Sequence, residues 1–309
     1  MSTYVVGDIH GCYDEWIQLK DRIEAQDSEA RFILVGDIID RGAKVYEMLN
    51  WAMQNISSNG KYQMILGNHE EEKIRWLQKY FEYKEEPGAS SIVIDDMEPD
   101  NYDFYDMCIH YRPSDQQLKN ILNWFDQLPY YKEVCVNMQK GKQRFIVVHS
   151  YLPSECVNKD GSFKKTSVKD SNSAVINYIR QRLKNSIIWH RDYWGNTYNK
   201  VIVVHGHTAT VSSSCTVRGA KSGRIWFNNN DINVDCGIVY REHREKANLA
   251  AIRLEDLEEF YVYDNAEPEG NENKEETVIY KQEMLEKRKR QKKQVDSCLF
   301  DEEFLKDLW

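Results

Sequence analysis

The sequence lacks the features that mark membrane, secreted and disulfide-bonded proteins. It has no N-terminal apolar segment of signal-peptide length and no run of about 18 apolar residues. Its seven cysteines are scattered and no two form a Cys-x-x-Cys pair, so neither a disulfide framework nor a zinc–thiolate site is indicated. We expect reduced thiols in a cytoplasmic protein that does not bind membranes. Cys12, at the expected start of a helix, is a candidate redox-sensitive thiol.

A surplus of basic charge is also missing. The chain has 41 Lys and Arg against 50 Asp and Glu, a formal net charge of -9, which argues against a nucleic-acid binder. Its 309 residues, 41% of them hydrophobic, suffice for one large domain with a proper core. We expect that domain at 1–263, an acidic surface excursion within it at 84–113, and a charged, helix-prone tail at 264–309. The apolar end of the tail would dock on its own domain or on a protein partner, and the sequence leaves both open.

The first seventy residues repeat one unit, in which an apolar run is followed by a glycine-bearing polar turn and then by a segment with helical periodicity. The runs are Tyr4–Val6, Phe32–Val35 and Met64–Leu66. The turns follow one another at intervals of about 30 residues, the length of a strand–helix–strand crossover. Three parallel strands would therefore place three polar turns on one edge of a sheet, where α/β proteins commonly carry their sites.

The second half of the domain is richer in strand-like stretches. Residues 133–139 and 144–149 alternate in polarity and flank Lys140-Gly141-Lys142, which predicts a hairpin. Further along we expect a helix over roughly 172–186, a buried strand at 201–204, and strand-like pieces at 224–227, 232–235 and 249–263. These strands have the composition of an antiparallel sheet.

Side chains that bind divalent metals occur at the expected strand ends. They are Asp8, His10, Asp37, Asn68, His149 and His207. One such pair would be an ordinary turn, but buried charge at so many strand ends is costly unless it is paired or bound to metal. The sequence therefore predicts a metal centre. It contains no Cys-x5-Arg loop and no Ser-His-Asp set, so a protein nucleophile is not indicated.

Three motifs carry a resemblance to a known family. They are Gly7-Asp8-Ile9-His10-Gly11, Gly36-Asp37-Ile38-Ile39-Asp40-Arg41-Gly42 and Gly67-Asn68-His69-Glu70. In this order and spacing they resemble the signature of the calcineurin-like metallophosphoesterases, in particular the phosphoprotein phosphatase branch. The resemblance covers roughly residues 3–263 and implies an α/β fold with a central β-sandwich flanked by helices. Where eukaryotic members have His-Gly-Gly, this chain has His149-Ser150-Tyr151, so it looks closer to phage-type Ser/Thr phosphatases and bacterial diadenosine tetraphosphatases.

The resemblance also implies a site for two divalent metal ions. It assigns one ion to Asp8 and His10, the other to Asn68, His149 and His207, and the bridging position to Asp37. His207 is preferred to His205 because the family's ligand follows the glycine. Manganese is the first expectation, although iron, zinc and nickel also suit nitrogen and oxygen ligands.

The remaining roles concern the phosphate. A hydroxide held between two metal ions would attack phosphorus in line with the leaving oxygen. His69 would protonate that oxygen while Asp40 holds its ring, or would only support the site. Arg41 and Arg191 would bind phosphoryl oxygens, Arg191 on a looser match to an arginine that follows a Trp in relatives. Asp235 and Gly237 resemble a late family element whose role is more often structural.

The expected function is that of a metal-dependent Ser/Thr protein phosphatase. Its substrate would be a phosphorylated protein or a small phosphoester, and no nucleic-acid partner is expected. An alternative is hydrolysis of diadenosine tetraphosphate, which changes the substrate but not the metal chemistry. An alternative of another class is a catalytically silent binding module on the same fold, but the sequence retains every expected ligand and His69.

Overall fold

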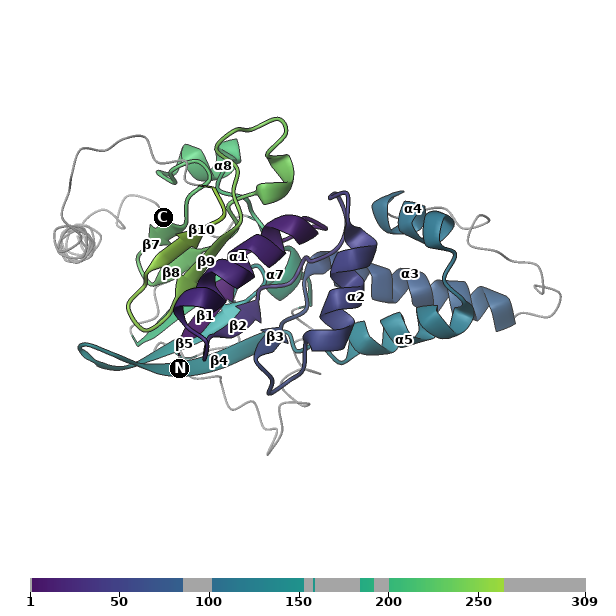
Figure 1. The fold of residues 1–309 in the computed structure, drawn as a ribbon, viewed down its shortest axis with the longest axis horizontal. Coiled ribbons are helices and arrows are strands. Elements are labelled where there is room, and N and C mark those ends of the chain that lie inside the picture. The colour runs from purple at the N-terminus through teal and green to yellow at the C-terminus, as the bar shows by residue number, and fades with distance from the viewer. Residues whose placement is uncertain (1, 86–101, 153–157, 159–183, 192–199, 264–309) are drawn as a thin grey trace, which may run out of the picture. The chain divides into compact units, whose positions relative to one another are not determined.

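A computed structural model describes residues 2–85, 102–152, 158, 184–191 and 200–263 (Figure 1). The tail expected at 264–309 and most of the helix expected over 172–186 lie outside the described residues. None of the described helices is both long enough and apolar enough to cross a membrane.

The first sheet has five strands in the order β10-β9-β1-β2-β3. Strands β1 (Thr3–Val6), β2 (Arg31–Leu34) and β3 (Tyr62–Met64) are parallel, with Val5 opposite Ile33 and Leu34 opposite Met64. Strand β9 (Ala250–Arg253) pairs antiparallel with β1 on the edge away from β2, and β10 (Glu259–Tyr261) pairs antiparallel with β9. The three parallel strands predicted from the repeated unit are confirmed.

The second sheet also has five strands, in the order β4-β5-β6-β8-β7. They are β4 (Tyr131–Met138), β5 (Gly141–Val148), β6 (Val201–His205), β7 (Trp226–Asn228) and β8 (Asp231–Asn233). The β4–β5 hairpin is confirmed, but β5–β6 and β6–β8 are parallel, so the expectation of an antiparallel second half is wrong for these pairs. Composition and alternation report which faces are buried and carry little information on strand direction.

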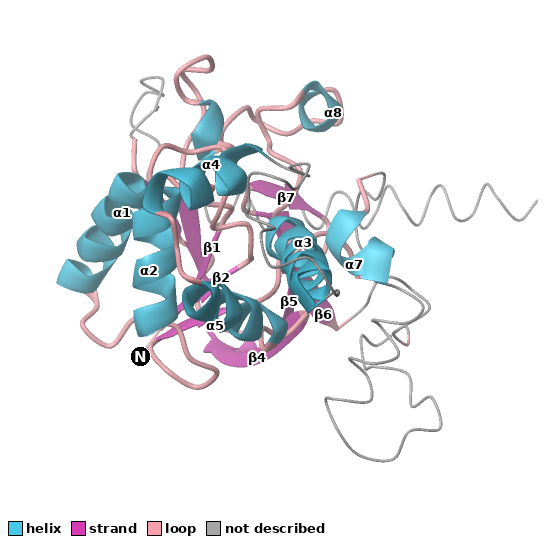
Figure 2. Cartoon of the chain, turned by 90° about the vertical axis from the view of Figure 1, so that its right-hand side faces the viewer, coloured by secondary structure: helices cyan, strands magenta, loops and turns pink. Residues whose placement is uncertain are grey.

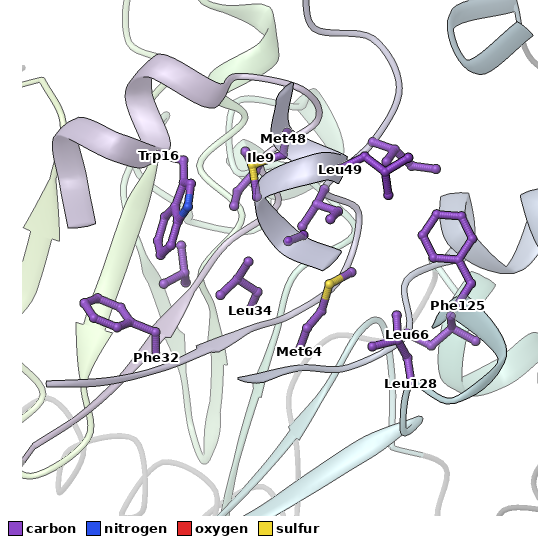
Figure 3. Close-up of a cluster of buried hydrophobic side chains, with 14 of the residues drawn as sticks. Ile9, Trp16, Phe32, Leu34, Met48, Leu49, Met64, Leu66, Phe125 and Leu128 are labelled. Carbon is purple, nitrogen blue, oxygen red and sulfur yellow. The ribbon is translucent and has the colours of Figure 1, made fainter. Parts of the chain in front are cut away.

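Two helices cover the outer face of the first sheet, α1 (Tyr13–Gln26) and α2 (Val45–Asn55), which Figure 2 shows beside β1 and β2. Each buries one stripe of apolar side chains at helical spacing. Trp16 of α1 and Met48 of α2 pack with Phe32 and Leu34 of the sheet, as Figure 3 shows. This packing fixes the strand ends from which the polar turns project.

The other helices are α3 (Asn68–Glu85), α4 (Tyr102–Tyr111), α5 (Asp115–Asp126), α7 (Lys184–Trp189), the short α8 (Ser213–Thr216) and the 3-10 turn η3 (Ile238–Tyr240). Helix α5 begins at a capping box, in which the side chains of Ser114 and Gln117 each accept a bond from the other residue's backbone amide. Helix α4 lies within the segment expected as a surface excursion. Its Phe104 and Cys108 are buried in the main core, so this part of the segment contributes to packing.

A second apolar layer lies between the two sheets. Val5, Ile33 and Ile65 from the first sheet pack with Phe145 and Val204 from the second. The two sheets and their flanking helices confirm the predicted α/β fold with a central β-sandwich. The sandwich also brings the carboxyl ends of β1, β2 and β3 next to those of β5 and β6.

Candidate metal centre

The polar turns after β1 and β2 are bonded to each other through their backbones. The amides of Ile9 and His10 both donate to the carbonyl of Asp37, at 3.1 and 2.9 Å, and Gly11 donates to the carbonyl of Ile38 at 2.8 Å. The two turns therefore form one rigid unit, which places the side chains of residues 8–11 against those of residues 37–41.

Several residues of these two turns, and His207 after β6, have backbone conformations that L-amino acids rarely adopt. Positive φ angles occur at His10 (47°), Asp37 (50°), Asp40 (66°), Arg41 (68°) and His207 (70°). Each such residue costs about 1–3 kcal/mol and persists only when its surroundings enforce it. All five were predicted as site residues from sequence, so the strain is concentrated where the site was expected.

Two glycines allow the ligand-bearing segments to approach closely. A Cβ on Gly67 would lie 2.2 Å from Asp37 Oδ1, and a Cβ on Gly206 would lie 2.0 Å from Asp8 Oδ1. The carboxylate of Asp8 is instead met by the backbone amide of His207, at 3.0 Å from Oδ2. Any larger residue at these two positions would displace a carboxylate of the site.

Asp37 lies between two groups of side chains. Its Oδ2 atom is 3.6 Å from Nε2 of His10 and 3.9 Å from Nε2 of His69 on one side, and 3.4 Å from Nε2 of His149 on the other. Its Oδ1 atom accepts from the backbone amide of His69 at 3.0 Å. Burial raises the pKa of Asp37, but the nearby histidines outweigh it and hold the pKa well below its usual range. This is the central position that a bridging carboxylate would need.

The second group consists of Asn68, His149 and His207. Oδ1 of Asn68 is 2.9 Å from Nε2 of His149 and 2.8 Å from Nδ1 of His207, and these two nitrogens are 3.2 Å apart. All three side chains are buried, at 0–6% exposure. Burial, His149 and Arg191 lower the pKa of His207 to about 2, so its ring is neutral at ordinary pH.

The donor set fits a cation. Nδ1 of His149 lies 2.8 Å from the carbonyl of Val35, which can only accept, so Nδ1 carries the proton of this bond and Nε2 is the nitrogen that faces Asp37. Nδ1 of His10 is likewise 2.9 Å from the carbonyl of Ile39. Imidazole nitrogens and carboxylate oxygens thus lie close together in the cluster, and these are the ligand atoms that a divalent metal ion binds.

Asp8 is part of the same cluster. It is 3% exposed, and burial together with Asp235 and Asp37 raises its pKa well above the ordinary value. Three buried carboxylates close enough to perturb one another are unfavourable without a compensating positive charge. Their proximity is a second indication that the cluster holds cations.

His69 is held by a carboxylate on the side away from the cluster. Its Nδ1 donates to Asp40 Oδ2 at 2.7 Å, and its Nε2 lies 3.0 Å from Nη2 of Arg41. Burial works against the charged ring, but Asp37 and Asp40 prevail and raise the pKa of His69. The ammonium of Lys73, only 2% exposed, lies 3.4 Å from the same oxygen of Asp40.

Arg41, in the turn after β2, and Arg191, which follows helix α7, both contact the cluster. Nη1 of Arg41 is 3.0 Å from Nε2 of His10, and Nη1 of Arg191 donates to the carbonyl of His207 at 3.4 Å. Both line one cavity together with Asp8, His10 and His207. The structure therefore brings together all ten residues predicted for the site.

Sequence reasoning missed two residues and left a third without a role. The buried carboxylate of Glu70 accepts three backbone amides, from Asp37 (2.8 Å), Ile38 (2.9 Å) and Gly67 (3.1 Å). It joins the turns after β2 and β3, and its place in the third motif was the sequence feature that could have identified it.

For Lys73, the only indication in the sequence was its position one turn after His69. Asp235 is 4% exposed and lines the cavity, so it belongs to the site environment.

Two other sequence hypotheses are resolved by side-chain surroundings. His205, the rejected alternative to His207, is 3.3 Å from Asp231 and lies apart from the groups that include Asp37. The surroundings of Cys12 argue against a redox-sensitive thiol, because burial and the nearby Glu15 and Glu242 raise its pKa to about 12. A protonated thiol is a poor nucleophile.

The family model of the calcineurin-like phosphoesterases matches residues 1–240. Among curated proteins, the symmetrical bis(5'-nucleosyl)-tetraphosphatase of Cronobacter sakazakii is 39% identical over 70 residues, 23% of this chain and 24% of that protein. The protein of the same name from Methylobacillus flagellatus is 41% identical over the same lengths. The chain thus spans about a quarter of the length of these relatives.

Solved structures with a similar chain path include phosphatases of different types. A protein serine/threonine phosphatase from Saccharomyces cerevisiae gives a TM-score of 0.45 at 14% identity, over 86% of this chain and 82% of that one. A cold-active protein-tyrosine phosphatase from a Shewanella species gives 0.44 at 19% identity, over 85% and 80%.

Proposed function

Because the chain belongs to the calcineurin-like phosphoesterase family, we propose that it is a phosphomonoesterase that depends on two divalent metal ions. The observation that carries this proposal is the position of Asp37 between His10 on one side and His149 on the other. Asp8 and His10 would hold one ion, Asn68, His149 and His207 the other, and Asp37 both. Two such ions would clamp the phosphate and supply a water of lowered pKa as the nucleophile.

The residues around the cluster would orient the phosphate and deliver a proton. Arg41 and Arg191 line the same cavity as the ligands, and their guanidinium groups match phosphoryl oxygens. Nδ1 of His69 is bonded to Asp40, so only Nε2 can give a proton to the leaving oxygen. Asp40 also holds the ring in the orientation that places Nε2 3.0 Å from Nη2 of Arg41, which lines the cavity.

For the substrate we propose first a protein phosphorylated on serine or threonine, whose side-chain oxygen would be the leaving group. A second candidate is diadenosine tetraphosphate, favoured by the 39–41% identity of a 70-residue segment to enzymes named for that reaction. Both substrates would use the same metal centre, Arg41 and His69. They differ in what must be bound beyond the reacting phosphate.

An activity panel with added manganese tests the proposal. It compares phosphoserine, phosphothreonine and phosphotyrosine peptides with diadenosine tetraphosphate, and each assay is repeated after chelator treatment. We expect hydrolysis that is lost with the chelator and restored by metal. For Asp37→Asn we expect loss of bound metal and of turnover together. Full metal content and full activity in this variant would overturn the mechanism. Wild-type protein that binds metal and hydrolyses none of these substrates would favour the silent binding module.

A further inference from the structure

The cavity beside the metal cluster is larger than one phosphate group requires. Its volume is about 410 Å³, within the range of about 300–1,000 Å³ that is usual for small-molecule sites. One part of its lining is the cluster itself, with Asp8, His10 and His207. Arg41, Arg191 and Asp235 also line it, and the remaining lining comes from residues 208–218, which follow His207, and residues 237–244, which follow β8 in the chain.

Four arginines line this cavity. Arg41 and Arg191 contact the cluster, at His10 and at the carbonyl of His207. Arg218 and Arg244 are anchored elsewhere, because Arg218 donates to the carbonyl of Ser214 at 3.2 Å and Arg244 donates to the carbonyl of Val211. Residues 211–214 thus hold both of these guanidinium groups on the same wall.

The charge on this wall is not balanced by the acids that line the cavity. Asp8 and Asp235 are 3–4% exposed, and both accept backbone amides, from His207 and Gly237. Among the residues that the structure describes, Arg244 forms no ion pair with a carboxylate. An exposed guanidinium group that is fixed by a single carbonyl retains donors for an anion.

Hydroxyl groups accompany these arginines. Ser212 and Ser214 also line the cavity, and their Oγ atoms lie 2.9 Å apart. Guanidinium and hydroxyl groups on one wall form the usual donor set for phosphate.

We propose that Arg218 and Arg244, with Ser212 and Ser214, form a second anion subsite for a substrate that carries two phosphate groups. The inference rests on the proposed function, because it places the first phosphate at Arg41 and Arg191. The substrate class is a small molecule whose second phosphate is either the next group in a phosphate chain or a separate ester. In both kinds of substrate, the second phosphate group would be the anion that binds Arg218 and Arg244.

Two pairs of compounds test the proposal, each differing by one phosphate. ADP and AMP represent a phosphate chain, and fructose 1,6-bisphosphate and fructose 6-phosphate represent separate esters. We expect wild-type kcat/KM to favour the two-phosphate member in at least one pair. For Arg244→Gln, loss of one bond to a charged group should reduce that preference about tenfold or more. The same direction is expected for Arg218→Gln, an exposed position that leaves the Arg244 anchor intact.

The control is Lys246→Gln, which removes one positive charge two residues from Arg244, outside the cavity lining. Its preference should equal that of the wild type, and Arg244→Lys should restore part of the lost preference. A wild-type ratio near one in both pairs would overturn the subsite, as would an equal loss for both members in the Gln variants. If no compound is hydrolysed, calorimetric binding of the same pairs to the metal-loaded chain decides the subsite, and the panel of phosphopeptides and diadenosine tetraphosphate decides the proposed function separately.

Discussion

Replacing Glu70 by glutamine tests how the metal centre is held together. The carboxylate is fully buried and accepts three backbone amides, those of Asp37, Ile38 and Gly67. Glutamine is nearly isosteric but keeps only one acceptor oxygen. In either orientation of the amide, at least one backbone N–H then faces an N–H group. The substitution therefore changes hydrogen bonding and leaves packing nearly unchanged.

The expected loss of stability follows from these bonds. A bond to a charged acceptor contributes about 1.5–3 kcal/mol, and a buried donor left unsatisfied costs about 1–3 kcal/mol. Adding one of each, we expect Glu70→Gln to lower the free energy of unfolding by about 2.5–6 kcal/mol. Because Glu70 fixes the backbone of Asp37, we also expect metal affinity to fall roughly 10–100-fold.

Urea denaturation of the metal-free protein measures the first quantity, and metal titration measures the second. The control is Glu82→Gln, an exposed site on the same helix, which should change stability by no more than about 0.5 kcal/mol. If Glu70→Gln matched this control in both unfolding and metal affinity, the carboxylate would not be joining the turns as described.

Three further predictions address other parts of the site. His69→Asn should lower turnover by about 10²–10⁴-fold with metals retained, and equal turnover would remove its proton-donor role. Gly206→Ala should reduce metal content, measured by elemental analysis, because the added Cβ would lie 2.0 Å from Asp8 Oδ1. At pH 8, iodoacetamide should modify exposed Cys135 well before Cys12, whose thiol pKa is raised to about 12, and peptide mapping would show the order.

Local sequence patterns were sufficient for the architecture of the first half of the domain. Apolar runs at intervals of about 30 residues predict three parallel strands, because a crossover helix needs that length of chain. The apolar stripe of α1 that contains Trp16 and the capping box at Ser114 are set by residues only a few positions apart in the chain. Strand direction in the second sheet depends on long connections, and composition does not encode it.

The sequence by itself determined which side chains could form the centre, because each lies in a short motif directly after an apolar run. Only the tertiary structure decided how they meet. Asp37 stands between His10 and His149 because the two sheets bring β2 and β5 together. The role of Glu70 as an acceptor for three amides and the common wall of Arg218 and Arg244 also arise from segments that meet only after folding. Such contacts depend on packing between distant segments, which no local pattern in the chain specifies.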